Sequence, residues 1–240
     1  MPFNFVRANQ WKDIYTLLEA DMPHLAKSYE AHRIASSTYI QKGMDNITDI
    51  ELAKSDFQKG EEFVDKALAI YDGDALLNES KLIVSFKLGR NKEAVEQAKK
   101  IAARFDYSKI SRDLLSEYYF SEGKYDSSAL YYKELIRLIP EDISLYYKYT
   151  NVLRMANKAE EAVSFSNSIR NNKSLPAYLP DECIFYVYYY NNQMDQALGY
   201  FTAAYDKGLR NRELEYTIID YYVRAGNKSV VETLKKKLKI

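Results

Sequence analysis

The chain reads ISRDLLSEYYFSEGKYDSSALYYKELIRLIPED from Ile110 to Asp142, and this stretch holds its clearest structural pattern. Two runs with apolar residues at helical spacing, 114–120 and 125–139, flank a short turn at Gly123, and Pro140 ends the second run. We therefore predict a hairpin of two helices. Each helix carries one apolar stripe, and a single pair cannot bury both stripes, so the hairpin needs similar neighbours to stack against.

The turn of this hairpin recurs along the chain. Residues that tolerate a left-handed backbone stand at successive spacings of 34, 34, 35 and 34 residues, at Gly89, Gly123, Asn157, Asn192 and Gly226. Five residues after each turn comes a mostly small residue, at Ala94, Ser128, Ala162, Ala197 and Val231. A small side chain there lets the second helix approach the first. This constant period is typical of a helical solenoid.

The same residues resemble the signature of the tetratricopeptide repeat (TPR) family. The matching positions are Leu115, Tyr119, Gly123, Tyr125, Tyr132 and Pro140. The departures are Arg112, Ser116 and Ser128, where the family often has Trp, Gly and Ala. The resemblance covers residues 75–240 well and the first 74 loosely. It implies an all-α, right-handed superhelical solenoid of about six antiparallel helix pairs, a scaffold that serves many partners.

We expect one helical-repeat domain over residues 1–240. Five regular repeats of 34–35 residues occupy 75–240, with first helices that start near Ala75, Ile110, Ile143, Tyr178 and Arg212. Residues 1–74 hold a cap helix and an irregular, longer helix pair. The cap helix is marked by Trp11, Ile14, Tyr15, Leu17 and Leu18.

The longer pair has its own start and stop signals. Its first helix runs from Leu25 to Ile40, Gly43 terminates it, and residues 41–47 form an exposed connection. Thr48, with Glu51 three residues later, is a capping box that starts the second helix. At the other end of the chain, the lysines of the last helix are interpreted as a solvated cap, since cations suit a helix C-terminus.

Composition narrows the class of protein. The 34 basic residues balance 34 acidic residues, which argues against a nucleic-acid-binding protein. The single cysteine, Cys183, cannot form an internal disulfide, and the start of the chain lacks the pattern of a secretory signal, so a reducing cytoplasm is the expected location. No apolar run approaches the roughly 20 residues of a membrane span, so no membrane insertion is expected.

The search for catalytic chemistry finds little. His24 and His32 lie on one predicted helix, about 12 Å apart at roughly 1.5 Å per residue, so they cannot share a metal ion. His32 is interpreted as a hydrogen-bonded core residue and Cys183 as a buried, inert thiol. No carboxylate stands in an apolar setting that would tune its pKa. We therefore predict a protein that is not an enzyme and binds no cofactor or metal.

The resemblance also implies a concave groove lined by the first helices, with three groove positions on each. Carried over residue by residue, these positions are Glu79, Ile83, Phe86, Asp113, Glu117, Phe120, Tyr147, Asn151, Arg154, Glu182, Tyr186, Tyr189, Tyr216, Asp220 and Val223. Aromatic and acidic residues are interspersed along this line, and Arg154 is its only basic residue. Such a groove suits a peptide or a partner helix that carries apolar anchors and Lys or Arg.

Several alternatives stay open from the sequence. The groove could lack a partner or hold the protein's own terminus. A non-catalytic adaptor is the first functional hypothesis, a cytoplasmic chaperone for a secreted or assembled client the second, and an enzyme with a repeat-built pocket at Glu182 and Tyr186 the third. The partner in the first two cases is a protein or peptide, and homo-oligomerisation stays open. Mostly acids and aromatics stand where family members that bind a terminal carboxylate have Lys, Asn and Arg, so the resemblance does not favour that role.

Overall fold

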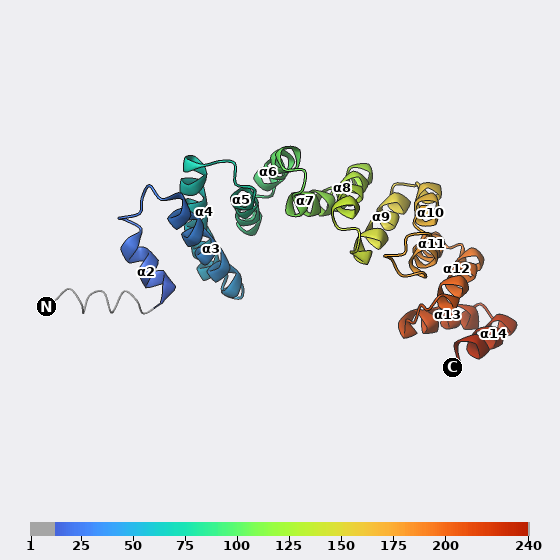
Figure 1. Ribbon diagram of the computed structural model, residues 1–240. Coiled ribbons are helices and arrows are strands. Elements are labelled where there is room, and N and C mark those ends of the chain that lie inside the picture. The colour runs from blue at the N-terminus through green and yellow to red at the C-terminus, as the bar shows by residue number, and fades with distance from the viewer. Residues whose placement is uncertain (1–12, 240) are drawn as a thin grey trace. The chain divides into compact units, whose positions relative to one another are not determined.

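The computed structural model describes residues 13–239 of the chain, and within them it contains thirteen helices and no strand (Figure 1). The prediction of an all-α fold is confirmed. The chain divides into two compact units, Met1–Glu122 and Gly123–Ile240. No helix within the described range is long and apolar enough to span a membrane.

The first unit contains six of the described helices. They are α2 (Ile14–Asp21), α3 (Tyr29–Asp45), α4 (Ile50–Ile70), α5 (Ala75–Lys87), α6 (Asn91–Arg104) and α7 (Lys109–Ser121). From α3 onward each helix packs against the next, and α5 also contacts α3 and α7. This is the contact pattern of stacked helix pairs, in which the first helices of successive pairs lie side by side.

The second unit contains the other seven. They are α8 (Tyr125–Leu138), α9 (Ile143–Met155), α10 (Ala159–Ser168), α11 (Leu179–Tyr190), α12 (Met194–Asp206), α13 (Arg212–Arg224) and α14 (Lys228–Leu238). Helix α9 packs against α8, α10 and α11, and α11 also packs against α10 and α12. The two first helices α9 and α11 are therefore neighbours.

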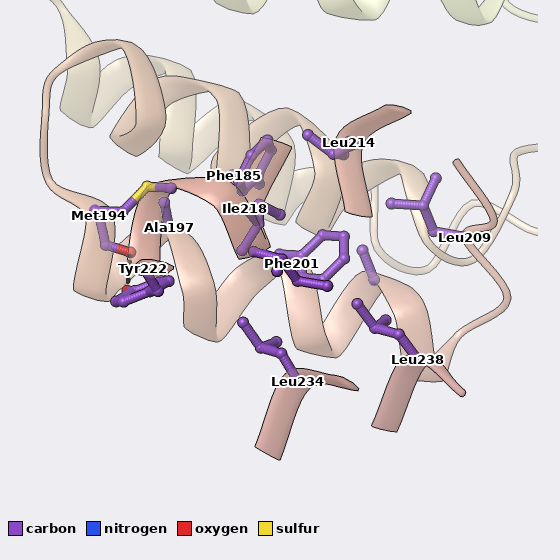
Figure 2. Packing of buried hydrophobic residues seen from close by; sticks show 12 residues of the cluster. Phe185, Met194, Ala197, Phe201, Leu209, Leu214, Ile218, Tyr222, Leu234 and Leu238 are labelled. Carbon is purple, nitrogen blue, oxygen red and sulfur yellow. Dashed lines mark hydrogen bonds between the residues drawn. The ribbon is translucent and has the colours of Figure 1, made fainter. Parts of the chain in front are cut away.

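The core of the second unit is largest around helices α11 to α14. Figure 2 shows the Phe201 ring near the centre of this cluster, with Phe185, Ile218 and Leu234 around it. Phe201 is 1% exposed, and its ring centroid lies 6.0 Å from that of Phe185. The hydroxyl of Tyr222 donates to the Met194 carbonyl oxygen at 3.3 Å, so the one polar atom of this buried ring is satisfied.

The turn residues behave as their spacing predicts. All five have a positive φ, with values of 74°, 70°, 59°, 58° and 70° for Gly89, Gly123, Asn157, Asn192 and Gly226. Glycine and asparagine are the residues that adopt this left-handed conformation most readily. The small residues that follow are fully buried at Ala94, Ser128, Ala162 and Ala197, whereas Val231 is partly exposed.

The irregular N-terminal pair differs from its prediction. Helix α3 begins at Tyr29, not Leu25, and it continues through Gly43 to Asp45, so residues 41–45 are helical and the connection begins only after them. Gly43 is needed for packing instead: a Cβ atom there would lie 2.8 Å from the ring of Phe57 in α4. Glycine at this position lets two long helices approach closely.

Two further N-terminal predictions are wrong. The side chain of Asp49, not Thr48, caps α4 by accepting a hydrogen bond from the Leu52 amide at 3.1 Å. His24 precedes α3 and so is not on the same helix as His32, which is buried and lies 2.9 Å from the Ala26 carbonyl oxygen through Nε2. The predicted cap helix corresponds to α2, although Trp11 lies outside the described residues.

Candidate functional site

A cavity of about 540 Å³ lies between α9 and α11 of the second unit. Its wall consists of Tyr147, Lys148, Thr150, Asn151 and Arg154 from α9 and of Glu182, Tyr186, Val187 and Tyr190 from α11. The structure thus brings together five of the residues predicted for the groove: Tyr147, Asn151, Arg154, Glu182 and Tyr186. The volume falls in the range of about 300–1,000 Å³ that is usual for ligand pockets.

The sequence of α9 directs one face toward this cavity. Asp142 caps the helix by accepting a hydrogen bond from the Ser144 amide at 3.0 Å. Tyr147, Asn151 and Arg154 then follow at spacings of four and three residues, which places them on one side of the helix.

Helix α11 presents an acidic and aromatic face. Pro180 lies in its first turn, where a missing N–H costs no helical hydrogen bond. Asp181 and Glu182 also lie in the first turn, where the helix dipole favours carboxylates. Tyr186 and Tyr190 follow Glu182 at successive spacings of four residues, so these three side chains share a face.

The Glu182 carboxylate is the most unusual group in the cavity. It is 5% exposed and accepts a hydrogen bond from the Tyr147 hydroxyl. Within residues 13–239 it forms no ion pair with Lys or Arg. Burial raises the pKa of Glu182, and the hydrogen bond from Tyr147 offsets part of that rise. The prediction that no carboxylate has a tuned pKa is therefore wrong.

The preceding residue shows the opposite arrangement. Asp181 is 2% exposed, and its oxygens lie 2.6 Å from Arg170 Nη2 and 2.5 Å from Lys207 Nζ. Burial by itself would raise the pKa of Asp181, but the two cations outweigh it and lower the pKa. Asp181 therefore links α11 to the α10–α11 connection and to the end of α12, whereas Glu182 has no such counter-ion within the described residues.

The two cations in the cavity wall contact other groups. Arg154 Nη2 donates to Asn151 Oδ1 at 2.9 Å, and its guanidinium carbon lies 5.1 Å from the ring centroid of Tyr190. Lys148 Nζ lies 5.7 Å from the ring centroid of Tyr132 in α8. The contacts of Arg154 with Tyr190 and of Lys148 with Tyr132 are cation–π interactions.

Three tyrosine rings surround the carboxylate. The ring centroids of Tyr147 and Tyr186 are 6.1 Å apart and the planes are nearly perpendicular at 88°. The rings of Tyr186 and Tyr190 are 6.0 Å apart and nearly parallel at 17°. Burial raises the pKa of Tyr147, and it raises that of Tyr186 to about 12, so both phenols remain hydrogen-bond donors at neutral pH.

The predicted groove and this cavity differ at the end of α11. Tyr189, a predicted groove residue, does not line this cavity but stacks on Phe185 at 5.4 Å, at the edge of the core. Tyr190 lines the cavity and was missed. The spacing of four residues from Glu182 through Tyr186 to Tyr190 was the available signal.

The remaining predicted groove residues lie elsewhere. Ile83, Phe86, Asp113 and Glu117 line a cavity of about 660 Å³ on α5, α6 and α7 of the first unit. Glu79 is buried and accepts a hydrogen bond from the Ser108 hydroxyl at 2.5 Å. Phe120 is half-buried, Tyr216 and Val223 on α13 are exposed, and Asp220 pairs with Arg224 at 2.7 Å.

Comparison with solved structures finds the same architecture elsewhere. The MamA protein is 18% identical with a TM-score of 0.50, over 72% of this chain and 91% of its own. PilF from Pseudomonas aeruginosa is 17% identical with a TM-score of 0.50, over 87% and 92%. YrrB, described as a TPR protein with an unusual peptide-binding site, is 14% identical with a TM-score of 0.52, over 80% and 92%.

The chain has the TPR fold. No protein-family model and no curated protein matches the sequence. At identities below 20%, the solved structures establish the TPR architecture alone. What the cavity of this TPR chain binds therefore depends on its own residues.

The adjacent acids of α11 predict opposite effects on stability. The raised pKa of Glu182 means that its contribution to the free energy of unfolding is complete below the unfolded-state pKa of about 4.3. This contribution is lost as the pH rises through the pKa of the folded state. The lowered pKa of Asp181 means that its contribution is present above about 3.9 and is lost as the pH falls. At neutral pH, Glu182→Gln should therefore maintain or raise the melting temperature, whereas Asp181→Asn should lower it.

Thermal unfolding of the two variants and the parent between about pH 3 and pH 8 measures this difference. The advantage of Glu182→Gln over the parent should grow as the pH rises, and the deficit of Asp181→Asn should shrink as the pH falls. A Glu182→Gln protein that melts well below the parent at neutral pH would show that the carboxylate is structural.

Proposed function

We propose that this chain is a non-catalytic protein-interaction scaffold, an adaptor that holds a peptide or helix of its partner in the cavity between α9 and α11. The observation that carries the proposal is the convergence of three tyrosines and a buried, ion-unpaired Glu182 in that cavity. Tyrosine side chains supply contact area at little entropic cost, and a buried carboxylate supplies selectivity. YrrB, a structure with the same fold, is described as having a peptide-binding site.

The chemistry of the wall favours binding over catalysis. Its nine described residues include one carboxylate and no histidine, serine or cysteine. Cys183, next to Glu182, is fully buried, and burial raises the pKa of its thiol to about 12, which keeps the thiol protonated. The Thr150 hydroxyl in the wall donates to the Tyr146 carbonyl oxygen at 2.9 Å rather than to a base, so a reaction at Glu182 would lack an activated nucleophile.

Site-specific photocrosslinking tests where a partner binds. A benzophenone amino acid is introduced at Lys148, which is exposed and lines the cavity, or at Gln196, which is exposed on α12 and lies outside its wall. After irradiation in a lysate of the native cell, we expect Lys148 to give a discrete adduct with one protein and Gln196 to give none. Equal adducts at the two positions, or none at Lys148, would contradict the proposal.

A further inference from the structure

The buried acids of the described chain are of two kinds. Asp56, Asp181 and Glu215 each have a cationic partner, at 3.3 Å from Lys42, at 2.6 and 2.5 Å from Arg170 and Lys207, and at 3.1 Å from Arg212. Glu79 and Glu182 accept hydrogen bonds from hydroxyl groups. A buried carboxylate without a counter-ion is costly, so its presence calls for a reason outside the free fold.

Glu79 also lines a cavity, whose wall includes Tyr71, Tyr107 and Lys109, but the surroundings of Glu182 differ. Three tyrosine rings line the cavity of Glu182, and the two cations of the wall contact Asn151, Tyr190 and Tyr132 rather than the carboxylate. Aromatic faces attract a cation and also pack against an alkyl chain. The cavity therefore has the Glu182 carboxylate at one end and tyrosine rings along its wall. This combination matches a long alkyl side chain that ends in a positive charge.

The hydrogen bond from Tyr147 favours a lysine of the partner over an arginine. The Tyr147 hydroxyl donates a hydrogen bond to Oε2 of Glu182. A guanidinium binds a carboxylate best through both oxygens at once, and would have to share Oε2 with this hydroxyl. An ammonium acts as a point charge and needs only the other oxygen.

We infer that the cavity is a receptor for one lysine side chain of the partner, whose alkyl stem packs against the tyrosine rings and whose ammonium pairs with Glu182. This inference rests on the proposed function and specifies the chemistry that the partner must present. The lysine supplies the counter-ion that Glu182 lacks among residues 13–239. An uncharged or acidic segment would leave the carboxylate buried and unpaired.

Selection from a displayed library of random heptapeptides tests the inference on the full chain. Peptides enriched on the parent protein should share a lysine at one fixed position. They should bind Glu182→Gln at least 10-fold more weakly, and bind the control Glu160→Gln, an exposed acid of α10, as tightly as the parent. Glutamine retains an acceptor for Tyr147, so the variant keeps its fold, which thermal unfolding verifies.

Synthetic versions of the best peptide then isolate the ammonium. Replacing its lysine by norleucine, which keeps the stem, should weaken binding at least 10-fold to the parent and hardly at all to Glu182→Gln. Enrichment without a common lysine, equal binding of the norleucine peptide, or tighter binding of an arginine peptide would overturn the inference. If the partner cross-linked at Lys148 binds Glu182→Gln and the parent equally, the lysine receptor fails while the scaffold proposal stands.

Discussion

Replacing Phe201 by alanine should lower the free energy of unfolding of the second unit by about 3–5 kcal/mol, the largest loss of stability expected in this chain. The side chain is 1% exposed and contacts residues of α11, α13 and α14 in one cluster. Its ring also lies 6.3 Å from that of Tyr205. Truncation removes buried apolar surface and leaves a cavity that three helices would have to close. Urea denaturation followed by circular dichroism measures the loss.

The neighbouring residue provides the control. Thr202 is half-buried, and its hydroxyl donates only to the Gly199 carbonyl oxygen of the same helix at 2.9 Å. Thr202→Ala should therefore change the free energy of unfolding by no more than about 0.5 kcal/mol. A Phe201→Ala protein that loses less than about 1 kcal/mol would show that the core of this unit lies elsewhere.

Local chemistry made the repeats predictable. A turn after each first helix requires a residue with positive φ, and glycine or asparagine stands at all five positions. The predicted starts at Ala75, Ile143 and Arg212 are the first residues of α5, α9 and α13. These signals depend on a few neighbouring residues, so the sequence alone specifies them.

Contacts between distant residues explain the failures. Glycine is typical of a helix end, but Gly43 lies within α3. A glycine is needed there because the ring of Phe57 lies where a side chain would be. Nothing near Gly43 in the sequence indicates this contact. Asp49 likewise displaced Thr48 as the cap, since the two candidates are adjacent and only the backbone conformation separates them.

The candidate site was predictable only in part, because helical spacing is a local property and packing between helices is not. Helical spacing carried over from the resemblance places Tyr147, Asn151 and Arg154 on one face of α9. At the end of α11, the spacing of four residues from Tyr186 indicates Tyr190, and the packing of Tyr189 on Phe185 leaves Tyr190 to line the cavity. The burial of Glu182 depends on Tyr147, 35 residues away, which pattern reasoning could not place.

Replacing Tyr190 by alanine should weaken binding of the partner by about 2 kcal/mol, or about 30-fold in Kd. Tyr190 lines the cavity, stacks on Tyr186 and lies under the guanidinium of Arg154, so its loss removes one wall. Its side chain is 54% exposed in the free protein, so the free energy of unfolding should change by less than about 1 kcal/mol. This variant should therefore lose affinity for the partner and keep nearly the parent's stability.

The central claim, that the partner binds between α9 and α11, is tested most directly by calorimetric titration of the partner cross-linked at Lys148. The partner is titrated into the parent protein, Tyr190→Ala and Tyr221→Ala, a matched control on α13 that is 46% exposed and outside the cavity wall. We predict that Tyr221→Ala binds like the parent and that Tyr190→Ala binds about 30-fold more weakly. Equal affinities of Tyr190→Ala and the parent would contradict the claim.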